Sequence, residues 1–370
     1  MTGIDRYILR QLAVALVAVT GGLALLIWLT QSLRFVELVV NRGLSFAVFL
    51  QLTSMMIPSF VVVILPITTF VVVLFVYQKL ASDRELVVMR AAGLSPASLS
   101  RPALTIAAIA TVCGWLLHIY IVPWSYGQFR EFQFEIRNRM AAVLLQDGVF
   151  TPVSDDVTVY VRERRNDGTL RGLVIHDARD RANPATILAE AGTITPGNGG
   201  PRVTLFNGSR QQLDRRTGRL NVLQFSENTL DLAQSRRAEE ESRARDSRER
   251  SIGELLHPDP SEPMNPRDIP KFRVEAHQRM SGPLTGISFA LVALATTLTG
   301  TFRRYGGLLR PLIGTGLLVG LLALGLSIGN LAARVPALIP LIWVHALLPG
   351  ALAGLVLFGP RGLQPAWARA

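Results

Sequence analysis

The sequence predicts an α-helical membrane protein with six transmembrane helices and an inserted all-β domain. Hydrophobic residues make up 49% of the 370-residue chain, and only 18% of its residues are charged, whereas about 25% are charged in globular proteins. A helix needs about 20 apolar residues to cross a bilayer, and six blocks reach that length. These blocks lie at about 11–33, 52–77, 102–124, 282–302, 308–332 and 337–359.

The first block is predicted to be a retained transmembrane helix and not a secretory signal peptide. Its apolar part is longer than the roughly 7–15 residues of a signal peptide, and no small-residue cleavage site follows it cleanly. The second block contains Pro58 and Pro66, so we expect it to be kinked or preceded by an interfacial helix from about residue 46. The fifth block is rich in glycine, which lets helices approach closely in lipid and favours a packing or sliding interface. Its glycines are Gly314, Gly316, Gly320, Gly325 and Gly329.

The net charge of +11 belongs to the segments that flank the apolar blocks. Residues 125–280 hold 24 Lys and Arg against 23 Asp and Glu, whereas the rest of the chain holds 14 against 4. With a cytoplasmic N-terminus, eleven of those fourteen basic residues fall on the cytoplasmic side, as the positive-inside rule requires. No nucleic-acid partner is needed to explain the charge, and residues 125–280 are expected on the opposite side of the membrane.

The polar insert begins with a predicted connector at 125–138 and a β region at 139–233. Within the β region, short segments alternate apolar and polar residues between Gly- and Asn-rich turn signals. Short strands of this kind suggest a sandwich, a jelly roll or an open barrel with one apolar face. The clearest alternating segments are 157–161, 173–176, 202–206 and 220–225.

Residues 234–280 lead back to the membrane. The run 235–250 has mixed charge and almost no apolar residues, which predicts a solvated helix or linker. A proline-rich connector follows, and 272–281 is expected to form a short amphipathic helix. This division leaves 1–124 and 281–370 as two membrane-embedded regions with three helices each.

No pattern for catalysis, a metal or a bound cofactor is found. The sequence lacks a GxxxxGK[ST] phosphate-binding loop, an HExxH zinc pattern and a GxSxG nucleophile motif. The single cysteine, Cys113, is predicted to be a packing residue in the third block. His118 and His345 are the only readily titratable groups inside the blocks. Because ion-driven transporters usually need carboxylates at mid-membrane, any transport energy is expected to enter from outside the helices.

The loop between the second and third blocks, residues 81–96, carries charges of both signs. Its stretch Ser82–Glu85 matches a capping box, Gly93 can supply a left-handed C-terminal cap, and Pro96 prevents the helix from continuing. The sequence therefore predicts a short helix over 82–94. It is either an interfacial helix that covers the membrane surface or a docking helix for a cytoplasmic partner, and these residues alone leave both open.

This segment resembles the coupling-helix motif E-x-x-x-M-x-x-x-G-x-S of the lipopolysaccharide export permeases, the LptF/LptG family. The motif residues here are Glu85, Met89, Gly93 and Ser95. The resemblance extends over the whole chain, and the stretches 123–125 and 140–150 are more similar to the F type than to the G type. Other similar stretches are Arg6–Arg10, Ile64–Pro66 and Glu275–Arg279 with Pro283.

The resemblance implies six transmembrane helices plus a periplasmic β-jelly-roll, in the inner membrane of a Gram-negative bacterium. The implied role is a non-catalytic permease subunit of an ATP-driven exporter that extracts lipopolysaccharide and passes it to a periplasmic jelly-roll bridge. The implied partners are a second permease of the LptG type, a dimer of cytoplasmic ABC ATPase subunits of the LptB type, and periplasmic jelly-roll proteins of the LptC and LptA types.

The resemblance also implies an ATPase-coupling surface. Glu85 matches the acidic position that contacts the ATPase. The other residues expected on this surface are Arg84, Met89, Arg90 and Gly93.

Lipid contacts and gates follow from the resemblance in the same way. Arg34 corresponds approximately to a basic position at the outer end of the first helix that meets lipid phosphates. Where the family often has another basic residue, this chain has Gln31 or Ser32, and Arg42 is the second candidate for head-group binding. The first and fifth helices form lateral gates in the family. The expected gate-helix residues are Gly316, Gly320 and Gly325.

Three other functions stay open at this stage. One is a mechanotransmitting permease of another ABC exporter class, in which nothing passes through the helices. A second is a non-transporting envelope scaffold, which would leave the capped 82–94 helix without a task. An enzyme acting on lipid is the third, and the missing nucleophile–base pattern counts against it.

Overall fold

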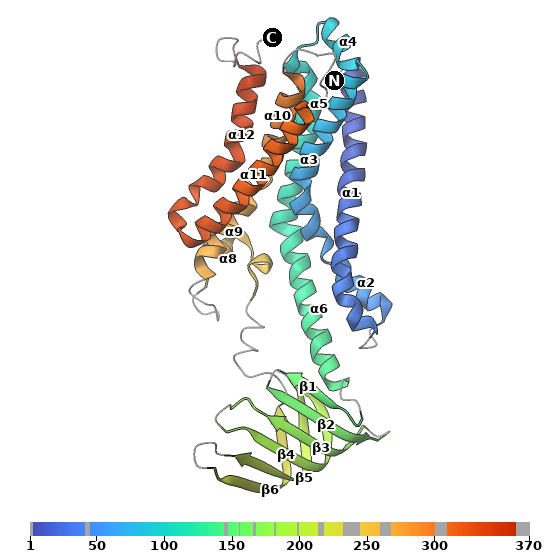
Figure 1. The fold of residues 1–370 in the computed structure, drawn as a ribbon, viewed down its shortest axis with the longest axis vertical. Helices are drawn as coiled ribbons and strands as arrows, with labels where there is room; N and C mark the ends of the chain where they lie inside the picture. The colour runs from blue at the N-terminus through green and yellow to red at the C-terminus, as the bar shows by residue number, and fades with distance from the viewer. Residues whose placement is uncertain are drawn as a thin grey trace. The chain divides into compact units, whose positions relative to one another are not determined.

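The computed structural model describes residues 3–40, 45–143, 147–154, 156–165, 168–180, 183–197, 200–213, 218–231, 245–259, 268–299 and 309–359. These residues fall into two compact units. A helical unit takes in Met1–Val36, Ala47–Gln128 and Asp246–Ala370, and the second unit takes in Glu37–Phe46 and Phe129–Arg245. Figure 1 shows the helices of the first unit and the sheet of the second.

The first region of the chain is almost wholly helical. Its elements are α1 (Gly3–Val40), α2 (Phe46–Ser54), α3 (Ile57–Ser82), α4 (Glu85–Ala91), α5 (Pro96–Leu116), the π-helix η1 (Leu117–Ile121) and α6 (Val122–Val143). A separate helix α2 does begin at residue 46, but Phe46–Ser82 together also qualify as one candidate span, so the interfacial position of α2 stays a prediction. Helix α6 continues to Val143, past residue 139 where the β region was expected to begin, because residues 122–143 hold few glycines or β-branched residues.

The last region of the chain returns to helix after the sheet. Its elements are η2 (Ser247–Glu249), α8 (Ile252–Leu256), α9 (Ile269–Ser281), α10 (Leu284–Leu298), α11 (Leu309–Arg334), η4 (Pro336–Leu338) and α12 (Pro340–Phe358). Among the described residues, five helices are long and apolar enough to cross a membrane, and a sixth span results if α9 and α10 are counted as one span bent by 51°.

The fourth predicted span differs most from the structure. The apolar block at 282–302 was expected to cross the bilayer, but α10 has 15 residues, about 22 Å of helix against a hydrocarbon core of about 30 Å. The break at Pro283 separates it from the more polar α9. The structure therefore supports five to six spans.

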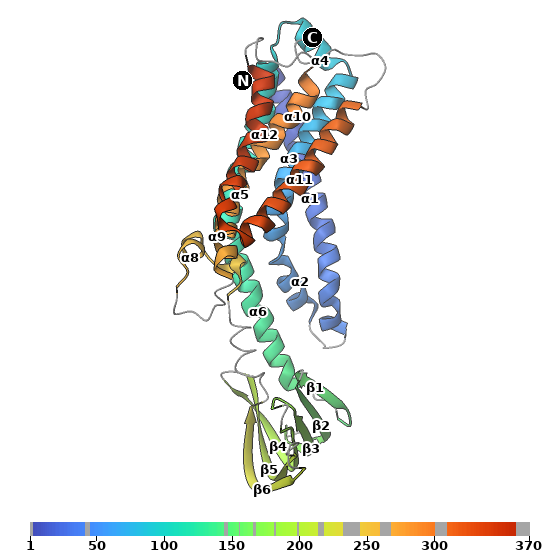
Figure 2. The ribbon, with the colours of Figure 1, turned by 60° about the vertical axis from the view of Figure 1, so that its left-hand side comes forward.

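Helix α10 lies at the centre of the helical unit. It packs against α3, α5, α11 and α12, and Figure 2 shows it among these helices. Ten of its 15 residues are buried, and Phe289, Ala290, Ala293 and Leu294 are at most 2% exposed. A helix that is apolar on all sides is typical of a bundle centre. Any displacement of α10 must therefore move the packing of four other helices.

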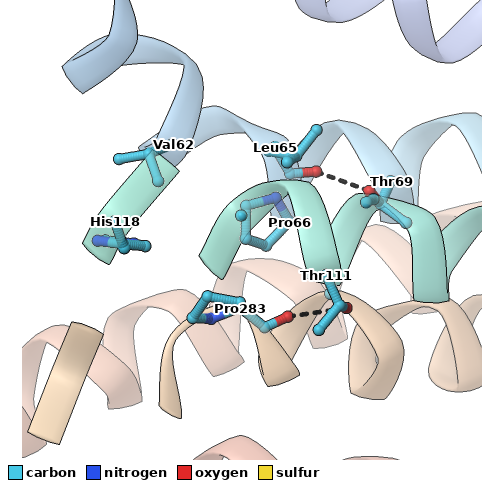
Figure 3. Close-up of a pocket in the computed structure, with 10 residues that line it drawn as sticks. Val62, Leu65, Pro66, Thr69, Thr111, His118 and Pro283 are labelled. Atoms are coloured by element: carbon cyan, nitrogen blue, oxygen red, sulfur yellow. Dashed lines mark hydrogen bonds between the residues drawn. The ribbon is translucent and has the colours of Figure 1, made fainter. Parts of the chain in front are cut away.

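Three helices depart from regular geometry at one level of the unit. Pro66 interrupts the hydrogen-bond ladder of α3, α5 passes into the π-helix η1, and Pro283 separates α9 from α10. Figure 3 shows Pro66, Thr111 and Pro283 around one small cavity of about 10 Å³. The Thr111 hydroxyl donates to the Pro283 carbonyl at 3.1 Å. This bond ties α5 to the break before α10.

The second unit contains one antiparallel six-stranded sheet with strand order β1-β2-β3-β4-β5-β6. The strands are β1 (Phe150–Ser154), β2 (Val157–Arg164), β3 (Leu170–Asp177), β4 (Ala185–Gly197), β5 (Gly200–Leu213) and β6 (Leu220–Asp231). All four alternating segments found in the sequence lie in these strands. Each described strand pairs with the strand next to it in the chain, and this arrangement is a β-meander. The strand connections of a jelly roll therefore stay a prediction.

One face of the sheet carries its core. Alternate residues of β2, β3, β4 and β5 are buried together, as the two-residue period of a strand requires. The fully buried members are Val157, Val159, Val161, Leu170, Leu173, Ile175, Ile187, Val203 and Leu205.

Candidate functional site

The start of α4 differs from the predicted capping box. Ser82 still belongs to α3, and its hydroxyl donates to the carbonyls of Gln78 and Lys79 at 3.0 and 3.1 Å, so it does not cap α4. The chain instead turns at Arg84, whose φ of 62° is left-handed. The predicted helix over 82–94 is therefore shorter, and α4 has seven residues. Ser82 could serve either helix, and its hydroxyl bonds to the last turn of α3 instead of capping α4.

The end of α4 forms as the sequence predicted. Gly93 has φ +88°; its amide donates to the Arg90 carbonyl at 2.9 Å, and the Leu94 amide donates to the Met89 carbonyl at 3.2 Å. These two bonds make a Schellman motif, which suits glycine because a Cβ is strained in the left-handed region. The Ser95 hydroxyl then accepts from the Ser98 amide and caps α5.

The two faces of α4 differ in exposure. Leu86 is fully buried, and Met89 and Leu94 pack half-buried against the same core cluster. Arg84, Val87 and Val88 are exposed on the other side. Figure 1 places α4 at the end of the helical unit where α1 begins. The helix thus has one face fixed to the bundle and one apolar and basic face open.

Two charged residues of α4 contact the rest of the bundle. The Tyr7 hydroxyl of α1 donates to Glu85 Oε1 at 3.4 Å, which leaves Glu85 half-buried at the rim of the open face. Arg90 donates from its guanidinium to the carbonyl of Leu298, at the end of α10. The structure thus places the five predicted coupling residues on α4 and at its two ends, but directs Met89 and Arg90 inward.

The open face also holds two apolar residues that were not among the predicted coupling residues. Val87 and Val88 are 41% and 67% exposed, although both are apolar. The available signal was helix geometry: positions one and two after the buried Leu86 point about 100° and 200° away from it, so they face away from the bundle.

The predicted lipid-contact residues are only partly placed. Arg34 is exposed on α1. Ser32, two residues earlier, is buried and donates to the Leu29 carbonyl at 2.8 Å. Arg42 lies outside the described residues.

The glycines of α11 fall into two groups. Gly316 and Gly320 have open space where a Cβ would stand. A Cβ at Gly325 would lie 2.8 Å from the His345 ring of α12, and one at Gly329 would lie 2.4 Å from the Gln278 amide of α9. Gly325 therefore permits close packing within the chain, whereas Gly316 and Gly320 leave a narrow strip of α11 uncovered.

A cleft of about 740 Å³ lies between α3, α9, α10, α11 and α12. Its walls are mainly apolar, and its polar groups lie on α9 and on the facing helices. The polar residues that line it are Ser247, Lys271, Glu275, Gln278, Ser281, Thr285, Asn330 and His345. Within the described residues, no group of three or more His, Cys, Asp or Glu side chains could hold a metal ion.

Two buried arginines, Arg279 of α9 and Arg250 at the end of η2, were missed by the sequence argument. Arg279 is 2% exposed; it donates to Glu275 Oε1 at 2.9 Å, to the Arg250 carbonyl at 2.8 Å and to the Ser247 carbonyl at 2.7 Å. Arg250 is equally buried, with its guanidinium 4.9 Å from the Phe272 ring. The prediction of a solvated segment over 235–250 is therefore wrong for Arg250. Cation–π contact and carbonyl bonding offset the cost of burying these groups.

Comparisons with known proteins agree with this architecture. The family model "Lipopolysaccharide export system permease LptF/LptG" matches residues 6–358. An uncharacterized protein of Rickettsia prowazekii (strain Madrid E) is 26% identical over 295 residues, which are 79% of this chain and 81% of the relative. Lipopolysaccharide export system permease protein LptF of Escherichia coli (strain K12) is 25% identical over 206 residues, which are 55% of this chain and 56% of the relative.

The aligned part covers most of the Rickettsia prowazekii protein but little more than half of the Escherichia coli protein. The family model, in contrast, extends from the start of α1 to the end of α12 and includes both the α4 turn and the sheet. The chain therefore belongs to the LptF/LptG family of lipopolysaccharide export permeases.

Proposed function

We propose that this chain is the F-type permease subunit of an ATP-driven exporter that extracts lipopolysaccharide from the inner membrane and passes it to a periplasmic β-jelly-roll bridge. The chain itself is non-catalytic, and a separate cytoplasmic subunit hydrolyses ATP. Family membership supports the lipopolysaccharide substrate. The five to six apolar helices fit a multi-pass inner-membrane protein.

The geometry of α4 carries the proposal. A short helix between two apolar helices would need no open apolar face if it only covered the bundle. Here Leu86 fixes one face in the core while Val87 and Val88 stay exposed beside Glu85. A groove on a partner ATPase of the LptB type would cover this face, in the way that an amphipathic helix fills an apolar groove. Because only residues 83–84 and 92–95 separate α4 from α3 and α5, a push on α4 reaches two transmembrane helices through short links.

The remaining partners follow from the same proposal. A second permease of the LptG type pairs with this chain, and α1 and α11 form the lateral gates. The open strip at Gly316 and Gly320 supports this, since it lets a partner helix approach α11 closely. The basic residues Arg34 and Arg42 bind the phosphates of the head group. Periplasmic proteins of the LptC and LptA types continue the jelly-roll bridge from the sheet of this chain.

Copurification tests the proposal. The tagged full chain is expected to bring down a P-loop ATPase and a second six-span permease. Glu85→Lys places a second positive charge beside Arg84, so it is expected to release the ATPase or to uncouple ATP turnover from lipopolysaccharide release. Asp83→Lys makes the same charge change outside α4 and serves as the control. If Glu85→Lys copurifies with the ATPase and transports normally, the coupling role of α4 is wrong.

The substrate is tested separately. A photo-crosslinking residue at Leu205, on the buried face of β5, is expected to capture lipopolysaccharide in cells. Capture of lipoprotein instead would favour another exporter class. No accumulation of lipopolysaccharide in the inner membrane after depletion of the chain would favour the scaffold.

A further inference from the structure

The Arg90 side chain points inward and connects α4 to α10, two helices that lie far apart in the sequence. Its guanidinium donates to the carbonyl of Leu298, 208 residues away. Leu298 is the last residue of α10 and is 2% exposed. The last carbonyls of a helix have no intrahelical donor and carry the negative end of the helix dipole. A guanidinium at this position therefore satisfies a buried acceptor and is held there electrostatically.

Hydroxyl groups of α10 and its C-cap donate to other carbonyls near the end of the helix. The Thr297 hydroxyl donates to the Ala293 carbonyl at 2.9 Å, and the Thr299 hydroxyl donates to the Ala295 carbonyl. Arg90 thus supplies a donor from outside α10 to this turn. Helix α4 reaches α3 and α5 through the chain, and it reaches α10 through this side chain.

The opposite end of α10 is attached to the extramembrane part of the chain. The break at Pro283 leads into α9, where Arg279 donates to the Ser247 and Arg250 carbonyls. The neighbouring Arg248 lies with its guanidinium 5.6 Å from the Tyr126 ring. Residues 247–250 are therefore fixed to α9 by buried bonds. In the chain, this segment continues through residues 232–244 to strand β6.

We propose that the bent pair α9–α10 transmits displacement of α4 to the connector at 247–250, with Arg90 and Arg279 as the positioning residues at its two ends. The inference rests on the proposed function, because it needs a partner that displaces α4. Helix α10 suits the role because its burial among four helices lets it move only as a unit. The 51° bend between α9 and α10 is the place where a shift of α10 becomes a change in the direction of α9.

Hydrogen exchange of the full chain, purified with its copurifying ATPase, tests this path. Exchange is compared between Mg-ADP and a non-hydrolysable Mg-ATP analogue, at α4, at the end of α10 and at 245–258. The wild-type complex is expected to respond to the nucleotide at all three places. Arg90→Ala is expected to keep the response at α4 and to weaken it at α10 and 245–258, because α3 and α5 still contact α10. Arg101→Ala, which removes an exposed arginine of α5, is expected to behave as wild type.

Two further variants separate positioning from loss of structure. Arg90→Lys keeps one donor for the Leu298 carbonyl and is expected to restore part of the response at 245–258. Arg279→Ala is expected to keep the responses at α4 and α10 while losing that at 245–258. An Arg90→Ala complex that responds normally at 245–258, or one that loses its response at α4, overturns the inference. A wild-type complex without any response at α4 overturns the proposed function instead.

Discussion

Replacement of Leu86 by alanine is expected to detach α4 from the bundle. Leu86 is the buried residue of the seven in α4, and it belongs to the same buried cluster as Tyr77, Leu80 and Leu99. Truncation of a buried leucine to alanine costs about 2–5 kcal/mol, with the low end where the site can collapse. Because α4 lies at the end of the unit, we expect about 2–3 kcal/mol. At about 1.4 kcal/mol per factor of ten, local opening of α4 becomes at least about 30-fold more frequent.

Amide hydrogen exchange of residues 85–94 in the isolated full chain measures this opening directly. The control is Val88→Ala, which removes apolar atoms from a side chain that is 67% exposed, and changes at exposed sites are usually within about 0.5 kcal/mol. Faster exchange confined to α4 in the Leu86 variant is the expected result. Equal exchange in the two variants, or faster exchange throughout the bundle, would refute the reasoning that Leu86 is the main apolar anchor of α4.

Two further predictions concern packing and pH. Gly350→Ala places a Cβ 2.8 Å from the Ser288 Cα of α10, so overpacking is expected to cost about 1–3 kcal/mol and to lower the Tm in lipid, whereas Gly354→Ala meets open space and should not. Burial would raise the pKa of Asp177, but hydrogen bonds from Arg179 outweigh it and the pKa is lowered. The sheet therefore gains stability from this carboxylate above about pH 4 and loses it as the pH falls below that value. In Asp177→Asn, exchange protection of the sheet, corrected for intrinsic rates, should fall less than in the wild type as the pH is lowered from about 5 to about 2.

The α4 turn shows which parts of the candidate site the sequence could predict. The Gly93 end was predicted correctly because a Schellman motif depends on six consecutive residues and on one glycine. The capping box was wrong because Ser82 has two possible helices to serve, and local sequence does not choose between them. Leu80 and Leu86 are both buried, at 1% and 0% exposure, and the left-handed turn at Arg84 is what lets both reach the core.

Long-range polar contacts were beyond the sequence argument. Arg90 was expected on a partner-facing surface, yet its acceptor lies 208 residues away on α10. Arg250 was predicted to lie in a solvated segment because its neighbours in the sequence are charged. In the structure it is buried against Phe272 of α9. The sequence alone does not show whether an arginine side chain contacts water, lipid phosphates or the end of another helix.

The sequence by itself determined the apolar blocks, the alternating strands and the glycine end of α4. Each of these depends on neighbours within about one or two turns of chain, where hydrophobic periodicity and backbone strain act. Only the tertiary structure decided that α10 is the buried centre, that the fourth block is bent at Pro283, and that α4 bonds to α10. These features arise where distant segments compete for burial and for hydrogen-bond partners, and that competition is resolved only when the helices pack.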